Sequence, residues 1–405
     1  MTAASSTAPG ARRYDLDWLR VIAFAILIFY HIGMFYVTWD WHVKSPHRGA
    51  AAELPMMFVN PWRLALLFFI SGIVVRYAMD RYVSSGAPLA RFAWKRFWRL
   101  FVPIAVGMAV IVMPQAYFQL RYEGVIEPGL LAFWPQYFSF DDHFGIVTPT
   151  WNHLWYVVYL LVYTMIVIAA APLLRPLADR FAGMNAKAGL ILIALTPLPF
   201  LFYRFALEPH FPETHALVDD WANHAHRFTI FLLGFMIAKN DGFWRAVDRA
   251  APAALGYIVL SVPLFAMAWF GDNWTKVDAI GLADLLRSMR IVYAWAVIVA
   301  LCAFARRRLN HDSPTLRYLT NAVFCYYILH QTITVAAGYE LTTLGLPWPL
   351  EFFLLTAATV GGCAVGYEVF RRIPYLRFAL GIEEKKTAPR PKARLLQGAS
   401  AVEPV

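Results

Sequence analysis

The chain has 405 residues, of which 60% are hydrophobic and only 15% are charged, and its mean hydropathy is +0.50. A soluble domain usually carries about a quarter charged residues, so this composition excludes an ordinary soluble protein. Apolar runs of about twenty residues recur without in-and-out alternation, which predicts helices that cross a hydrocarbon core about 30 Å thick rather than barrel strands. The chain is therefore predicted to be an all-α integral membrane protein.

Ten spans are predicted, and they form one bundle. They cover residues 18–38, 61–79, 98–118, 153–172, 188–205, 226–239, 252–270, 285–304, 317–337 and 350–370. The fifth span is interrupted by Pro197 and Pro199 and the sixth is short, so the borders of these two are the least defined. The bundle is predicted as one domain over residues 18–381, between a cytoplasmic segment, 1–17, and a basic, disordered tail, 382–405.

Lysine and arginine are distributed unevenly between the two sides of these spans. Ten spans place both termini on one side, and the segments on that side carry 27 of the 36 Lys and Arg. Because cytoplasmic loops are enriched in these residues, both termini are predicted to face the cytoplasm. The net charge of +10 follows mostly from this asymmetry and does not require nucleic acid as a partner.

The first span carries charged residues at one end and a histidine at the other, in the stretch LDWLRVIAFAILIFYH (16–31). Arg20 and His31 are eleven residues apart, about three helical turns, so both side chains point from the same face. His31 is expected at or just beyond the membrane midplane, where an ionisable side chain is a functional candidate by default. The alternative is a histidine that only hydrogen-bonds within the bundle, but Asp17 and Arg20 on the same face favour a functional role.

The second and third spans contain two further motifs. In FFISGIVVRY (68–77), the small pair Ser71-Gly72 allows close helix packing or leaves room for a ligand, and packing is the favoured interpretation. In RFAWKRFWRLFVP (91–103), Arg96 and Arg99 are neighbours on one helical face. A positive-inside flank is the favoured interpretation of this cluster, and a grip on cytoplasmic phosphates is the alternative.

Three histidines lie towards the predicted outer side. His42, in the first outer loop, is expected to be exposed. His153, in WNHLWYVVYL (151–160), fits an interfacial aromatic belt better than a site over a sugar ring. His330, in CYYILHQ (325–331), is a second intramembrane histidine. No metal site and no covalent serine mechanism are expected, because the sequence has no C-x-x-C, H-E-x-x-H or G-x-S-x-G motif.

These elements together resemble the membrane acyltransferase-3 family, whose signature is similar to Arg20, ten residues and His31, followed by R-x-x-R at Arg96 and Arg99. The resemblance implies a multi-pass protein of the bacterial inner membrane with no permanently bound cofactor. It implies acyl-CoA as a co-substrate on the cytoplasmic side and a carbohydrate hydroxyl as the acceptor on the other. In this scheme His31 is the base or acyl-handling residue.

The resemblance also assigns the remaining candidates. Arg20, Arg96 and Arg99 would bind the donor, while Asp17, His153 and His330 are secondary candidates. Within the family, the stretches TWDWHVKS (38–45), FFISG (68–72), HLWYVVYL (153–160), YYILHQ (326–331) and YEVFRRIPYLRFALG (367–381) resemble members that succinylate osmoregulated periplasmic glucans.

That closer resemblance implies a succinyl donor, with acetyl as the alternative, and a glucan acceptor. Proteins of glucan synthesis are then candidate partners, beside the lipid bilayer itself. Two interpretations from other classes remain at this point. One is a secondary transporter in which His31, His330 and Arg20 form a relay. The other is a non-enzymatic subunit of a polysaccharide synthesis or export complex.

Overall fold

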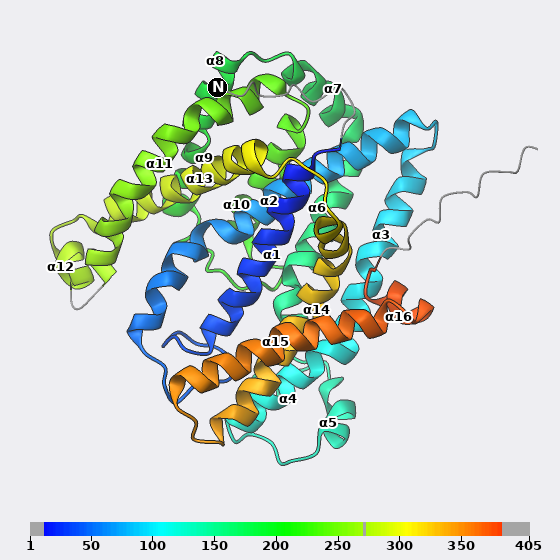
Figure 1. Ribbon diagram of the computed structural model, residues 1–405, viewed down its shortest axis with the longest axis vertical. Helices are drawn as coiled ribbons and strands as arrows, with labels where there is room; N and C mark the ends of the chain where they lie inside the picture. The colour runs from blue at the N-terminus through cyan, green and yellow to red at the C-terminus, as the bar shows by residue number, and fades with distance from the viewer. Residues whose placement is uncertain (1–11, 270–272, 383–405) are drawn as a thin grey trace, which may run out of the picture.

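The computed structural model describes residues 12–269 and 273–382, which form helices and no β-strand (Figure 1). The α-helices are α1 Tyr14–Met34, α2 Glu53–Ser84, α3 Leu89–Val106, α4 Met113–Tyr122, α5 Leu130–Tyr137, α6 Trp155–Ala169, α7 Ala171–Ala182, α8 Ala186–Leu195, α9 Pro197–Ala206, α10 Trp221–Ile237, α11 Asp241–Trp269, α12 Asn273–Ala279, α13 Ala283–Arg308, α14 Pro314–Thr342, α15 Trp348–Phe370 and α16 Pro374–Ala379. The 3₁₀-helices η1 Ala50–Ala52 and η3 Asn152–Leu154 precede α2 and α6, and a π-helix, η2 Gly107–Val112, joins α3 to α4.

Eight helical stretches in the described part of the chain are long and apolar enough to cross a membrane, and they fall on eight of the ten predicted spans. The predicted spans 226–239 and 317–337 fall on α10 and α14, which are helical but do not meet the same criterion. Helix α10 has only 17 residues, and α14 carries polar side chains in its middle, among them His330 and Gln331. An all-helical multi-pass membrane protein is confirmed, whereas ten spans and cytoplasmic termini stay predictions.

Several predicted borders are wrong by a turn or more. Helix α1 ends at Met34 rather than residue 38, so His31 lies in its last turn instead of near the middle of a longer span. Helices α2 and α11 begin well before the predicted residues 61 and 252. The reason is that hydropathy marks only the apolar part of a helix, and both helices continue through polar residues. The predicted disordered tail lies, from residue 383 on, outside the described residues.

Lys44 explains where α1 ends. The last carbonyl groups of a helix have no partner inside the helix and must be satisfied from elsewhere. The chain after α1 turns back, and the buried Lys44 Nζ donates to the carbonyl oxygens of Met34 at 2.8 Å and Val37 at 2.9 Å. The turn that carries His31 is therefore held from outside the helix.

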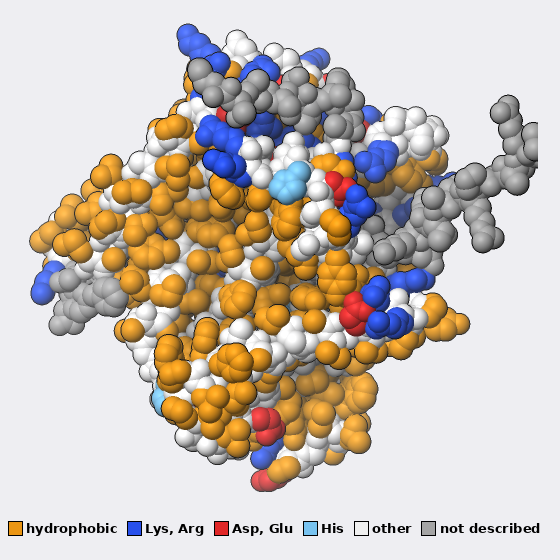
Figure 2. Space-filling view, viewed as in Figure 1, with side chains coloured by type: hydrophobic (Ala, Val, Ile, Leu, Met, Phe, Trp, Pro, Cys, Tyr) orange, Lys and Arg blue, Asp and Glu red, His pale blue; other side chains and the backbone are white. Residues whose placement is uncertain are grey.

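The helices pack around α1, which lies in the middle of the view (Figure 1). Helix α1 contacts α2, α13 and α14, while α10 packs on α2 and α15 packs on α14. A broad band of apolar side chains crosses the visible face, and most of its Lys and Arg gather beyond one edge of that band (Figure 2). Such a band is the surface that a helical membrane protein presents to lipid.

Helices α2 and α10 touch backbone to backbone. A methyl group added at Gly72 would overlap the carbonyl oxygen of Phe231, and one added at Gly234 would overlap that of Phe69. Small residues at a membrane helix interface permit this close approach. The packing interpretation of Ser71-Gly72 is therefore confirmed for Gly72.

The substitution Gly72→Ala is expected to lower the free energy of unfolding by about 1–3 kcal/mol, because the added methyl forces two backbones apart. Thermal unfolding of the detergent-purified protein measures the effect. Gly361→Ala on α15 is the matched control, since nothing lies within 4 Å of its added methyl. Equal unfolding temperatures for the two variants would contradict the close contact.

Candidate functional site

The structure brings together two histidines that are 299 residues apart in the chain. Nδ1 of His31, in α1, lies 2.7 Å from Nε2 of His330, in the middle of α14. The two rings are nearly parallel, with an angle of 8° between their planes. His330 is fully buried, whereas His31 is partly exposed. His31 is thus the member of the pair that a substrate can reach.

The hydrogen bonds of His330 determine which nitrogen of His31 is basic. Nδ1 of His330 lies 2.6 Å from the carbonyl oxygen of Tyr327, and a carbonyl can only accept. Nδ1 of His330 therefore carries the hydrogen, and in a neutral ring its Nε2 accepts. His31 must then donate through Nδ1, which leaves the lone pair on its Nε2. Among the described residues no partner occupies that Nε2, so it is oriented to take a proton.

His153, the middle residue of η3, joins this pair. Its ring lies edge-on to that of His330, with centroids 5.2 Å apart, and it is 5% exposed. Its Nε2 donates to the carbonyl oxygens of Tyr327 at 3.2 Å and Ile328 at 3.1 Å, and its Nδ1 accepts from the amide of Gln115 at 3.2 Å. The expectation of an interfacial belt residue is corrected, because His153 is buried against α14.

A line of amide and imidazole groups continues from this point towards the loops. The side-chain amide of Gln331 lies 3.1 Å from Oε1 of Gln115, 3.0 Å from Oδ1 of Asn152 and 3.0 Å from Nε2 of His42. His42 in turn lies 2.5 Å from Oε1 of Gln119 through its Nδ1. The expectation that His42 is exposed is wrong, because the loop after α1 folds back and places its ring between Gln331 and Gln119.

The π-helix η2 helps to place Gln115. A π-helix shifts the backbone hydrogen bonds and is frequent at functional sites. Three carbonyl oxygens of η2 accept from side chains elsewhere: Met108 from Tyr137 at 3.2 Å, Ala109 from Trp134 at 3.1 Å and Ile111 from Thr332 at 2.5 Å. The hydroxyl of Thr332 also accepts from Gln115, at 2.6 Å. The segment is thereby tied to α14 at the level of the histidines.

Arg20 and Asp17 lie at the other end of α1. They form an ion pair at 3.9 Å, and Asp17 also pairs with Arg12 at 2.8 Å. Fourteen residues of continuous helix, about 21 Å, separate Asp17 from His31. Asp17 therefore does not orient His31, and any role it has belongs to the end of the site near Arg20.

Arg20 of α1 and Arg96 of α3 both act electrostatically on one buried tyrosine. Arg96 is half-buried on α3 and Arg99 is exposed one turn later. Tyr156 of α6 is 3% exposed and lies within electrostatic range of both Arg20 and Arg96. Its hydroxyl is 2.8 Å from Oγ of Ser71 on α2. Side chains of α1, α2, α3 and α6 thus interact here, and Arg20 itself lies eleven residues, about three turns, from His31.

Arg63, on α2, is a buried cation near His31 that the sequence interpretation did not single out. It is 7% exposed, and its guanidinium carbon lies 3.5 Å from the ring centroid of Tyr30, the residue before His31. Its side chain bonds to Asn60, and its Nε is buried without a hydrogen-bond partner among the described residues. No carboxylate of the described residues lies within ion-pair distance of it, although the charge of Glu213 acts on it. The sequence does contain a sign of this residue, because an arginine inside a predicted span is costly in a membrane and is therefore a functional candidate, as His31 is.

Comparison with known proteins adds the following findings. A family model described as "Acyltransferase domain", of the acyltransferase-3 group, matches residues 13–368. The chain is 24% identical over 384 residues to the protein named "Glucans biosynthesis protein C" of Escherichia coli O6:K15:H31, and 24% identical over 384 residues to the protein of that name in strain K12. Each alignment covers 91% of this chain and 94% of the relative. No solved structure matches the chain.

Proposed function

The chain belongs to the membrane acyltransferase-3 family and is an acyltransferase, and we propose that it moves a succinyl group from cytoplasmic succinyl-CoA to a hydroxyl of a periplasmic glucan. The observation that carries this proposal is the His31–His330 pair, which leaves a basic nitrogen three turns of helix from a cluster of arginines. The glucan acceptor is supported by the name of the relatives. A transporter or a non-enzymatic subunit has no such support.

The donor is proposed to bind between α1 and α3. Arg20, Arg96 and Arg99 would hold the phosphates of CoA, since guanidinium groups form paired hydrogen bonds to phosphate oxygens. The pantetheine arm would then follow α1 towards His31, which lies eleven residues, about 16 Å, beyond Arg20. The separation of about 16 Å between Arg20 and His31 fits a donor such as CoA, whose phosphates and thioester are joined by an extended arm.

The acceptor is proposed to approach from the opposite side. The line of groups from Gln115 through Gln331 and His42 to Gln119 offers amide and imidazole partners of the kind that sugar hydroxyls use. Gln119 also donates to the exposed Glu123 at 3.0 Å, so this line reaches the surface of the protein. A sugar hydroxyl could therefore exchange water for these groups on its way to His31.

The proposed reaction needs one base and no covalent protein intermediate. The sugar hydroxyl gives its proton to Nε2 of His31 while its oxygen attacks the thioester carbonyl carbon. The C–S bond then breaks, an ester forms, and the leaving thiolate of CoA takes the proton back from Nε2. His330 accepts the Nδ1 hydrogen throughout, which fixes the ring and stabilises the imidazolium that forms.

A succinyl donor also carries a free carboxylate, and Arg63 is proposed to bind it. Arg20 is not assigned this role, because it lies about 16 Å along α1 from His31 and a succinyl group is much shorter. Arg63 instead contacts Tyr30, and its charge acts on His31. Because no carboxylate of the described residues lies within ion-pair distance, the guanidinium can bind one brought by the substrate, in competition with the more distant charge of Glu213.

The substitution Arg63→Gln is expected to lower kcat/KM for succinyl-CoA by about 10- to 100-fold, the worth of a charge-assisted hydrogen bond. Acetyl-CoA should be affected by less than about threefold, since an acetyl group has no carboxylate to bind. The ratio of the two donors is the measurement, and it does not depend on how much protein is folded. Arg180→Gln, at an exposed arginine of α7, is the matched control. An equal loss for both donors would assign Arg63 a purely structural role.

The function itself is tested with the purified chain in nanodiscs. Release of CoA from succinyl-CoA and from acetyl-CoA is followed with and without a linear glucan, and the glucan is weighed by mass spectrometry. The expected result is glucan-dependent CoA release and a glucan heavier by one or more succinyl groups. Transfer of acetyl alone would overturn the succinyl assignment, and no transfer from either donor would overturn the proposed function.

A further inference from the structure

A second basic site, which none of His31, His153 and His330 lines, is a cavity of about 440 Å³ between α2, α9, α10 and α13. Its charged and imidazole lining residues are Arg204, Glu208, Glu213, His226, Arg227, Arg287 and Arg290. Nine Lys and Arg lie on the side of the spans predicted to be outer, and four of the nine line this cavity. That concentration is the opposite of what the positive-inside rule leads one to expect on this side.

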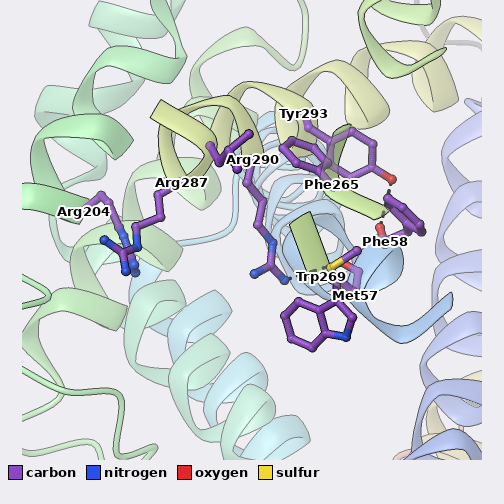
Figure 3. A pocket seen from close by; sticks show the side chains of 9 residues that line it. Met57, Phe58, Arg204, Phe265, Trp269, Arg287, Arg290 and Tyr293 are labelled. Carbon is purple, nitrogen blue, oxygen red and sulfur yellow. Dashed lines mark hydrogen bonds between the residues drawn. The ribbon is translucent and has the colours of Figure 1, made fainter. Parts of the chain in front are cut away.

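A smaller cavity of about 130 Å³ adjoins it and shares three of its arginines, Arg204, Arg287 and Arg290. Figure 3 shows these three side chains reaching in from one side, with the aromatic rings of Phe265, Tyr293, Phe58 and Trp269 on the other. These three arginines therefore line both the larger, polar cavity and the smaller, aromatic cavity.

The carboxylates of the cavity are already engaged. Glu208 pairs with Arg204 and with His226, whose Nε2 is 3.1 Å from it. Glu213 pairs with Arg227 at 3.6 Å and with His215 at 2.9 Å. Arg287 pairs with Asp284 at 2.8 Å. Each acidic group thus has its own cation, and the cations outnumber them.

Arg290 is the arginine without such a partner. Within the described residues its side chain donates to the carbonyl oxygen of Met57, at 3.5 Å, and no carboxylate pairs with it. The charge of Arg204 acts on it as well. Like charges that are half-buried together destabilise a fold unless a counter-charge joins them. An arginine in this position inside a helix of a membrane protein is therefore best explained by a ligand.

We propose that this cavity is a binding site for an anionic group, a phosphate or a carboxylate, and that Arg290 is its anchoring cation. Arg204 and Arg287 lie on the same wall and supply further guanidinium donors, and the smaller, aromatic cavity accepts an apolar portion of the same ligand. The site is separate from the donor site around Arg20 and goes beyond the acyl transfer proposed above. A headgroup of the outer leaflet and a soluble anion share this chemistry.

Binding is measured without turnover, so that the result does not depend on the proposed reaction. Purified protein in a neutral detergent is titrated with inorganic phosphate and, separately, with succinate, against chloride at constant ionic strength, and the unfolding temperature is recorded. In a second arm, native mass spectrometry counts phosphatidylglycerol and phosphatidylcholine retained by the protein. The variants are Arg290→Gln and, as the matched control, Arg245→Gln at an exposed arginine of α11.

A saturable stabilisation by phosphate or succinate whose midpoint rises about tenfold in Arg290→Gln, but not in Arg245→Gln, supports a soluble anion. Retention of phosphatidylglycerol over phosphatidylcholine that is lost only in Arg290→Gln supports a lipid headgroup. No selective effect in either arm, or an equal effect in both variants, overturns the proposal. If Arg290→Gln is not monodisperse, Arg204→Gln is measured in its place with the same criteria.

Discussion

Replacing His31 by alanine is expected to lower the rate of acyl transfer by about 10²–10⁴-fold, the usual contribution of a positioned general base. The expectation rests on the hydrogen bonds that place the lone pair of His31 on Nε2 and keep its Nδ1 occupied by His330. Binding of the donor should change little, because the arginines that would hold CoA lie three turns away. Steady-state kinetics of CoA release in nanodiscs, with the glucan at saturation, measures both quantities.

The control for this prediction is His311→Ala, which removes an exposed imidazole after the end of α13. It should retain the rate of the unchanged protein. A His31→Ala protein that still transfers at more than a tenth of that rate would show that another group takes the proton. Unchanged unfolding temperature in both variants separates a chemical effect from a loss of structure.

Replacing His330 by phenylalanine is expected to lower kcat by about 10- to 100-fold, as the loss of an orienting partner usually does. Phenylalanine keeps a ring in the buried position but cannot accept the hydrogen of His31, so the His31 ring is free to turn. The KM for the donor should stay within about twofold, since His330 does not touch the proposed donor site.

The conservative variant His330→Gln distinguishes positioning from packing. A glutamine carbonyl can reach towards Nδ1 of His31 and accept its hydrogen, so part of the lost kcat should return. If the glutamine variant is no better than the phenylalanine variant, or if KM rises as much as kcat falls, His330 does not act through His31. Thermal unfolding of both proteins completes the comparison.

The sequence was sufficient to predict an all-helical membrane fold and to show which ionisable residues share a helical face, because both depend on local patterns. Arg20 and His31 share a helical face as their spacing requires, and the apolar runs all lie on helices. The pairing of His31 with His330 depends on how α1 packs against α14, and no local pattern contains that contact. His31 and His330 were each candidates because an ionisable residue inside a span is costly, but that criterion contains no information on whether the two side chains are in contact.

The errors have physical causes that can be named. His42 was expected in water because it follows the first span, but the segment after α1 turns back over the bundle and carries it inside. Polar residues in the middle of α14 lower its hydropathy, and those residues belong to the candidate site. Arg63 and Arg290 lie inside the predicted spans 61–79 and 285–304, but their contacts with Tyr30 and with the carbonyl oxygen of Met57 depend on how the helices pack, which no local pattern contains.

The close backbone contacts of Gly72 with Phe231 and of Gly234 with Phe69 have a consequence for how substrates could enter. Two helices whose backbones touch cannot slide or part without losing that contact, so we expect α2 and α10 to move together. Helix α2 carries Arg63 and Ser71, and α10 carries Arg227, so we expect the distances between these groups to change little when substrates enter. Any hinge that opens the bundle must therefore lie elsewhere, and the π-helical joint between α3 and α4 is an irregular backbone where bending is least costly.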